Sequence, residues 1–97
     1  MTILWTATAV GHLAAIHEYI SQTSPFYADR MVQRILARGP QLTTFPDSGR
    51  AVPEVGRSDI REVIEGPYRV IYRVTESQVA VLAVVHGRQA RIGPLPQ

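Results

Sequence analysis

The chain has 97 residues, a formal net charge of +2 and no cysteine. This length suits one domain with one hydrophobic core, so we expect no domain boundary within residues 1–97. The lack of cysteine excludes disulfides and thiolate metal sites, and so small a net charge does not by itself define a nucleic-acid-binding protein. All ten basic residues are arginine, which reflects either a GC-rich genome or a need for bidentate contacts with phosphate or carboxylate groups.

The sequence contains no sign of membrane insertion or export. No apolar run approaches the roughly 20 residues that a transmembrane helix needs. The N-terminus lacks the basic start and the small-residue cleavage site of a signal peptide. We therefore expect a cytoplasmic protein without a membrane partner.

The N-terminal part predicts a short strand and then a helix. Residues 2–5 are β-prone, and Thr6 or Thr8 can cap the helix that follows. The apolar residues Ala9, Leu13, Ile16 and Ile20 recur at helical spacing. His12 and His17 lie beside this stripe without a second ligand at a suitable spacing, so we interpret both as ordinary boundary or surface residues and expect no metal or other cofactor.

A second helix begins at Ser24-Pro25, because serine accepts hydrogen bonds from the first turn and proline is tolerated at the first helical position. Its apolar stripe consists of Ala28, Met31, Val32, Ile35 and Leu36. The two helices predict a hairpin that packs its apolar side on a sheet. Gly39-Pro40 should kink or end the second helix.

Residues 45–59 are rich in Pro, Gly, Asp and Ser and predict a long surface loop, either a contact surface or a simple connector. Three β-rich runs follow, over residues 60–64, 68–74 and 79–85, with breaks at Glu65-Gly66-Pro67 and Thr75-Glu76-Ser77, and they predict an antiparallel meander. In the middle run Val70, Tyr72 and Val74 alternate with Arg69, Ile71 and Arg73, so one face should be core and the other half polar. The last run is apolar on both faces, as in a strand inside a sheet.

These elements predict an α+β fold, in which an N-terminal strand and a helical hairpin combine with a small, mostly antiparallel sheet. Within this frame the chain resembles the RelE/ParE superfamily of toxins from type II toxin-antitoxin pairs, also called plasmid stabilisation proteins. The residues that carry the resemblance are Leu42, Phe45, Pro46, Gly49, Arg50, Pro53 and Glu54, then Arg61-Glu62-Val63, the run from Tyr68 to Val74, and Val84-Val85-His86-Gly87-Arg88.

The resemblance implies a toxin that a cognate antitoxin, encoded beside it, neutralises by wrapping a segment around its surface. It also implies that operator DNA is contacted mostly through the antitoxin. Two targets are known in the superfamily: RelE-like members cut mRNA in the ribosomal A site, and ParE-like members act on DNA gyrase.

RelE-like ribonucleases use basic strand residues and a Tyr or His near the C-terminus. Arg69 stands where those enzymes have a phosphate-binding arginine, but Ile60 and Glu62 stand where lysines would be expected, and the tail beyond Arg88 has no Tyr or His. A working set of Arg61, Arg69, His86 and Arg88 is the alternative hypothesis. It depends on a strand register that places Arg61, Arg69 and Arg73 on one sheet face and Glu62 on the other.

The sequence therefore favours a ParE-like gyrase inhibitor without catalytic residues of its own, with Arg88 and Arg91 as target contacts. The alternative is a RelE-like, metal-independent endoribonuclease that acts on the ribosome and mRNA, and a module that has lost toxicity is a third reading. We also expect the sheet face away from the helices to expose apolar atoms, such as those of Ile71, for the antitoxin to cover.

Overall fold

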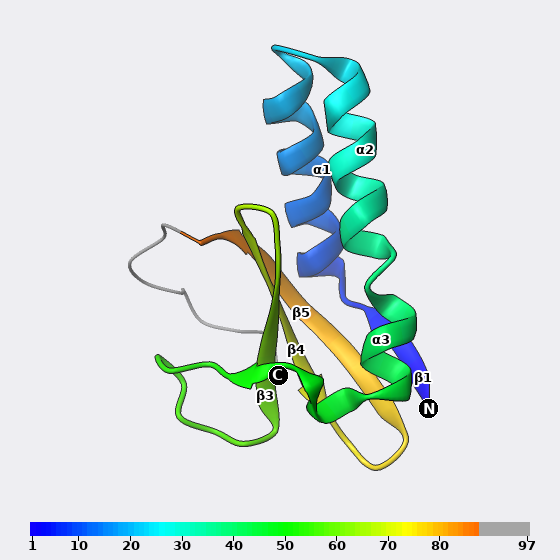
Figure 1. Ribbon diagram of the computed structural model, residues 1–97, viewed down its shortest axis with the longest axis vertical. Helices are drawn as coiled ribbons and strands as arrows, with labels where there is room; N and C mark the ends of the chain where they lie inside the picture. The colour runs from blue at the N-terminus through cyan, green and yellow to red at the C-terminus, as the bar shows by residue number, and fades with distance from the viewer. Residues whose placement is uncertain (88–97) are drawn as a thin grey trace.

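The computed structural model describes residues 1–87, which form one five-stranded sheet and a set of helices on one of its faces (Figure 1). The strands are β1 (Thr2–Trp5), β2 (Arg50–Ala51), β3 (Ile60–Glu65), β4 (Tyr68–Val74) and β5 (Gln78–His86). The helices are α1 (Ala7–Ser21), α2 (Pro25–Leu36) and α3 (Gly39–Thr44), and η1 (Pro46–Ser48) is a single 3-10 turn.

The strand order is β1-β5-β4-β3-β2, with β1 parallel to β5 and every other pair antiparallel. The predicted α+β class and the meander of β3, β4 and β5 are confirmed, and so is the entry of residues 2–5 into the sheet. β5 lies between β1 and β4 and contributes residues to an apolar core on each face of the sheet, which explains why its sequence does not alternate.

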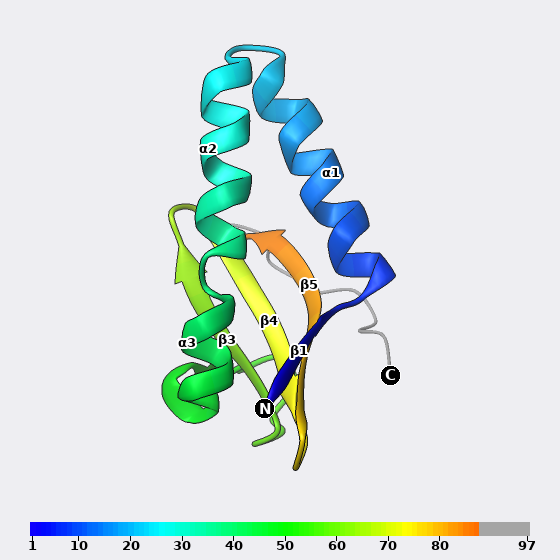
Figure 2. The same cartoon turned by 90° about the vertical axis from the view of Figure 1, so that its right-hand side faces the viewer.

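Both helices of the hairpin begin at the predicted caps. The hydroxyl of Thr6 accepts a hydrogen bond from the Ala9 N–H, and that of Ser24 accepts one from the Tyr27 N–H. The hairpin covers one face of the sheet and extends past the sheet's end (Figure 2). α2 ends at Leu36 and α3 begins at Gly39, so of the two outcomes predicted for Gly39-Pro40, a kink or an end of the second helix, the structure has the end.

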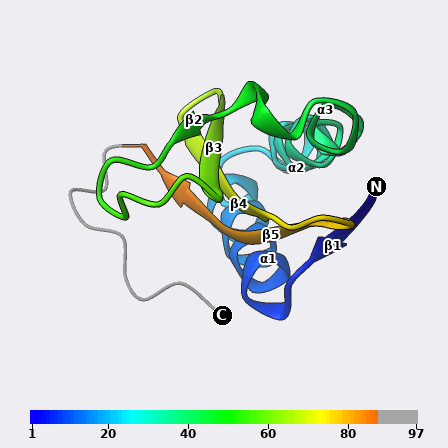
Figure 3. The same ribbon diagram turned by 90° about the horizontal axis from the view of Figure 1, so that it is seen from below.

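The sheet has a separate apolar core on each face. On the helix face, Val70, Tyr72 and Val81 pack with Leu13 and Ile35. The opposite face carries a second, smaller core, which consists of Val52, Ile60, Ile71, Ala80, Leu82 and Ala83. Viewed from below, the segment that follows β2 lies against that second face (Figure 3).

Two predictions about the second face were wrong. Ile71 is 0% exposed, because Val52 and its neighbours from the chain's own loop cover it, so Ile71 offers no surface to an antitoxin. Residues 45–59 are also more than a loop, since they contain η1 and the edge strand β2, which pairs with β3.

Among residues 1–87, no helix is long and apolar enough to cross a membrane.

Candidate functional site

The first candidate site is a group of four charged side chains on the face opposite the helical hairpin. We call Arg50, Glu54, Glu62 and Arg69 the Arg69 cluster. Arg69 donates from Nε to Glu62 Oε1 at 2.6 Å and from its two terminal nitrogens to the carboxylate of Glu54 at 2.7 and 2.9 Å. Arg50 donates to the other oxygen of Glu62 at 2.6 Å.

The Arg69 cluster is deeply placed and electrically balanced. The side chain of Glu62 is 0% exposed and that of Arg69 is 7% exposed, and two arginines face two glutamates. Hydrogen bonds from Arg69 lower the pKa of Glu54 to about 2, and the same contact with Glu54 raises the pKa of Arg69. All three guanidinium nitrogens of Arg69 are bound to carboxylates, so this arginine holds the loop at Glu54 to the sheet.

The register of β3 and β4 differs by one residue from the register on which the ribonuclease hypothesis depends. Ile64 lies opposite Arg69, and Glu62 lies opposite Ile71. Glu62 therefore shares a face with Arg69 and Arg73, whereas the prediction placed it on the other face. Arg61 lies on the helix face, where it is opposite Tyr72.

Arg61 belongs to a structural corner at the start of β2. It donates from a terminal nitrogen to the Gly49 carbonyl at 3.0 Å, and its Nε lies 3.5 Å from Asp47 Oδ1. In the same corner the hydroxyl of Tyr72 donates to the Pro46 carbonyl at 2.7 Å and accepts from the Gly49 N–H at 3.0 Å.

His86 lies at the opposite end of the helix face. Its ring meets the Tyr68 ring edge to face, with centroids 5.7 Å apart, and its strand partner is Tyr68, four residues along β4 from the partner of Arg61. Four residues of a strand span about 13 Å. The structure thus does not bring Arg61, Arg69 and His86 together, and Arg88 and Arg91 lie outside the described residues.

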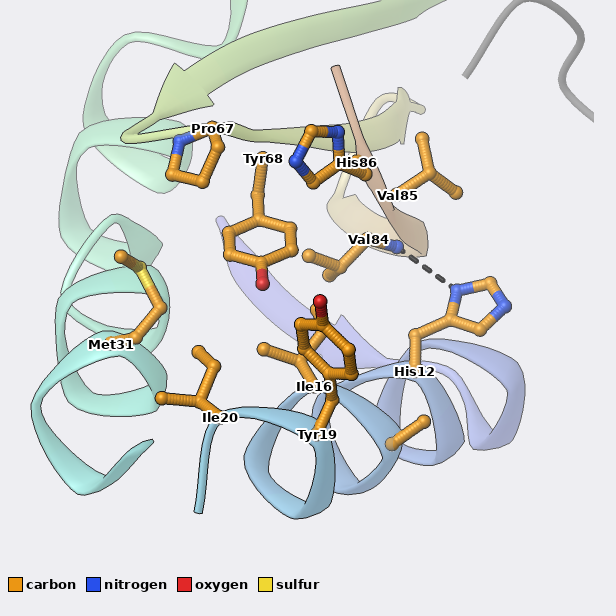
Figure 4. A pocket seen from close by; sticks show the side chains of 11 residues that line it. His12, Ile16, Tyr19, Ile20, Met31, Pro67, Tyr68, Val84, Val85 and His86 are labelled. Atoms are coloured by element: carbon orange, nitrogen blue, oxygen red, sulfur yellow. Dashed lines mark hydrogen bonds between the residues drawn. The ribbon is translucent and has the colours of Figure 1, made fainter. Parts of the chain in front are cut away.

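The second candidate site is an apolar groove where α1, α2 and the end of the sheet meet (Figure 4). It has a volume of about 660 Å³. Its lining consists of His12, Ala15, Ile16, Tyr19, Ile20, Met31, Pro67, Tyr68, Val84, Val85 and His86. On one wall the Nδ1 atom of His12 accepts a hydrogen bond from the Val84 N–H at 3.1 Å.

Arg69 and His86 could be identified as candidates from the sequence, whereas the carboxylate partners of Arg69 and the contact of His12 with β5 could not. Glu54 was part of the family resemblance, but its contact with Arg69 spans 15 positions and depends on how the loop folds back. His12 was assigned to the boundary of the helix stripe, and it is half-buried there. Its bond to Val84 joins residues 72 positions apart, and no local pattern encodes such a contact. Among residues 1–87, no group of three His, Asp or Glu side chains lies close enough to hold a metal ion.

A helical hairpin on a mostly antiparallel sheet, with a balanced charge cluster on one face and an open apolar groove on the other, defines a small α+β protein whose open surface is suited to a protein partner. The family model described as the ParE toxin of the type II toxin-antitoxin system parDE matches residues 3–91. The chain therefore belongs to the ParE toxin family and is a type II toxin of the ParE/RelE superfamily.

The chain is similar to a relative named as a RelE toxin and to a solved structure named as a ParDE system. "Toxin RelE2" of Caulobacter vibrioides is 33% identical over 85 residues, which cover 87% of this chain and 92% of the relative. The structure of the chromosomal ParDE system from P. aeruginosa has a TM-score of 0.73 and 25% identity, and covers 89% of this chain and 95% of that one.

A further structure, the RelBE2 toxin-antitoxin complex from Mycobacterium tuberculosis, has a TM-score of 0.63 at 21% identity over 88% of this chain and 95% of that one. At this level of identity the similarity supports the fold alone.

Proposed function

We propose that the protein is a ParE-like toxin that inhibits DNA gyrase by direct binding and is neutralised by a cognate antitoxin. The observation that carries this choice of target is the Arg69 cluster. The arginine that would bind a phosphate in a RelE-like ribonuclease is held by two carboxylates, one of them fully buried.

Metal-independent RNA cleavage needs a base near the ribose 2'-hydroxyl, a cation at the phosphate and an acid at the leaving oxygen. A phosphate at Arg69 would have to displace Glu54 and would lie beside Glu62, where like charges repel. His86 lies on the opposite face of the sheet from Arg69. Arg61 lies at the opposite end of the sheet from His86. These positions favour inhibition by protein contact over catalysis.

The competing function is ribosome-dependent mRNA cleavage. The observation that favours it is the name of the Caulobacter relative, which is a RelE toxin. Under that function, residues from both faces of the sheet would have to act on one phosphodiester. The antitoxin partner is supported by the family model, which describes a toxin of a type II toxin-antitoxin system, and by the similar structure from a ParDE system. Arg88 and Arg91 remain our predicted contacts with gyrase.

Induction of the toxin in bacterial cells tests the target. We expect a DNA-damage reporter to rise and cells to filament while incorporation of labelled amino acids continues. Co-expression of the antitoxin should suppress both effects. If amino-acid incorporation stops before any DNA-damage signal, the target is the ribosome and the proposal is wrong.

Two variants refine this test. The double variant Arg88→Ala/Arg91→Ala should lose toxicity if these arginines contact gyrase. Arg57→Ala is the matched control, because Arg57 is an exposed arginine that pairs with its neighbour Asp59 and belongs to neither candidate site. Equal toxicity of the double variant and the control would show that the predicted contacts are wrong.

A further inference from the structure

The exposed side of α2 carries a row of side chains at four-residue spacing, which we call the Arg30 ridge: Phe26, Arg30, Arg34 and Arg38. Residues four apart lie on one face of a helix, with Cβ atoms about 5–6 Å from each other. The first three are exposed, and the ridge continues just past the end of α2 to Arg38. None of the four lines the groove of Figure 4, so the ridge is a separate surface.

Glu65 shows how the Arg30 ridge holds a carboxylate. Arg34 donates from a terminal nitrogen to Glu65 Oε2 at 2.6 Å. Arg38 donates from Nε to Glu65 Oε1 at 2.9 Å. Two arginines one turn apart thus bind the two oxygens of one carboxylate through charge-assisted hydrogen bonds, which are the strong kind.

The same geometry recurs one turn earlier without a carboxylate. The Arg30 guanidinium lies 5.7 Å from the centre of the Phe26 ring, and in the part of the chain that the structure describes no carboxylate is paired with it. Arg34 uses one terminal nitrogen for Glu65, and its side chain is 53% exposed. A second carboxylate, from another molecule, therefore fits between Arg30 and Arg34 in the same way.

An open hollow of about 370 Å³ adjoins this position. Its lining consists of Phe26, Arg30, Gln33, Arg34 and Ala37. Phe26 is 63% exposed, so a large apolar ring lies in solvent beside two arginines. Aromatic and arginine residues are enriched at the centres of protein interfaces and carry much of the binding energy there. The hollow therefore suits a segment that has an apolar side chain next to a carboxylate.

We propose that the Arg30 ridge binds an acidic segment of gyrase, with a carboxylate between Arg30 and Arg34 and an apolar side chain against Phe26. The proposal rests on the proposed function in taking gyrase as the target. Three arginines and the single carboxylate of Glu65 leave the ridge with an excess of positive charge, which favours an acidic partner. Duplex DNA would place phosphates on the arginines and leave Phe26 without an apolar contact, so a protein segment matches the ridge better.

Site-specific cross-linking tests the contact, because the chain has no cysteine and one introduced thiol can be labelled alone. Gln33→Cys places a benzophenone label in the hollow and leaves the arginines intact. Ser58→Cys is the control, since Ser58 is exposed and lies outside the ridge. With purified gyrase and DNA, we expect only the Gln33→Cys toxin to cross-link, to a gyrase peptide that contains Asp or Glu. Cross-links to DNA, no cross-link, or equal cross-linking of both variants would overturn the proposal.

Charge reversal measures how much the contact contributes. Arg30→Glu places a like charge where the gyrase carboxylate binds, and we expect the toxin concentration for half-inhibition of supercoiling to rise at least about tenfold. Arg30→Lys keeps the charge but loses the planar fork, so its rise should be smaller. Arg57→Glu is the matched control, because it changes the net charge equally at an exposed arginine outside the ridge. Equal inhibition by Arg30→Glu and Arg57→Glu would contradict the proposal.

Affinity for the antitoxin encoded beside the toxin reports whether the Arg30→Glu toxin is intact, and we expect it to stay within about threefold of the wild type. Weaker antitoxin binding with unchanged inhibition of gyrase would assign the ridge to the antitoxin and overturn the proposal. Wild-type toxin that leaves gyrase active would contradict the proposed function and this inference together. Gyrase inhibited equally by wild-type and Arg30→Glu toxin would contradict this inference alone.

Discussion

Tyr72 and Gly49 fix residues 46–49, which precede β2, against the sheet. Tyr72 is 0% exposed, and its hydroxyl joins two backbone groups of residues 46–49. A Cβ atom at Gly49 would lie 2.5 Å from both the Glu62 carbonyl and the Tyr72 hydroxyl. Burial raises the pKa of Tyr72, so the phenol stays protonated and can donate its hydrogen bond.

Tyr72→Phe should lower the free energy of unfolding by about 1–3 kcal/mol, because the buried Gly49 N–H loses its acceptor. Urea denaturation followed by circular dichroism measures this change. Tyr27→Phe is the control, since Tyr27 is 65% exposed and should unfold like the wild type. A Tyr72→Phe variant as stable as this control would contradict the role of the hydroxyl.

Two glycine-to-alanine changes should have opposite signs. Gly49→Ala should destabilise the protein, because neither the Glu62 backbone nor the packed Tyr72 ring can move away easily. Gly11→Ala lies at an exposed position of α1, where the new Cβ would meet no atom within 4 Å beyond its chain neighbours and the helix's own backbone, and it should stabilise the protein by about 0.5–1 kcal/mol. Thermal unfolding of both variants checks this, and a Gly49→Ala protein at least as stable as the wild type would refute the proposed packing.

At the scale of elements, the loop after β2 is held to the sheet by an ion pair that depends on pH. The pKa of Glu54 falls from 4.5 in its ordinary state to about 2 in the folded protein. A depressed carboxyl pKa stabilises the fold fully above the unfolded value, and this stabilisation is lost as the pH falls through the folded value. The contribution is therefore present at neutral pH and disappears between about pH 4.5 and pH 2.

Glu54→Gln should remove this part of the acid dependence. The difference in unfolding free energy between wild type and variant should be largest at neutral pH and should shrink steadily as the pH falls toward 2. Urea titrations at several pH values measure it. Other carboxylates with lowered pKa values, such as Asp59, are present in both proteins and cancel in the difference. A difference that does not change with pH would show that Glu54 and Arg69 are not paired in solution.

The elements themselves could be predicted because their signals are local. The caps at Thr6 and Ser24, the break at Gly39-Pro40 and the strand runs all depend on neighbouring residues. The register of β3 and β4 could not be predicted in the same way. Gly66 has a φ of 58°, and Glu65 pairs directly with Tyr68, so the turn has two residues where the sequence indicated three. That difference of one residue moved Glu62 onto the face of Arg69.

The bulge in β5 is a second feature that local patterns did not indicate. Ile71 lies opposite Ala83 while Tyr72 lies opposite Val81, so Leu82 is an extra residue in the pairing. Because β5 is apolar on both faces, its alternation contains no sign of this insertion. The burial of Ile71 likewise depends on the loop that carries Val52, which comes back to the sheet from a distant part of the sequence.

At the scale of the whole molecule, the two faces of the sheet have different roles. The face away from the hairpin is closed by the chain's own loop and by the Arg69 cluster, whose charges are balanced. The face toward the hairpin ends in an open apolar groove beside the strand edge at Val84. Within residues 1–87, Arg69 is bound by carboxylates of Glu54 and Glu62, and this pairing is the basis of our proposal that the target is gyrase and not mRNA.

Purified toxin added separately to a gyrase supercoiling reaction and to ribosomes programmed with mRNA tests this account most directly. We predict that supercoiling is lost with accumulation of cleaved DNA, that the mRNA stays intact, and that added antitoxin reverses the effect. Cut mRNA with gyrase untouched would contradict the account, because the paired Arg69 would then have to release Glu54 and serve the ribonuclease reaction.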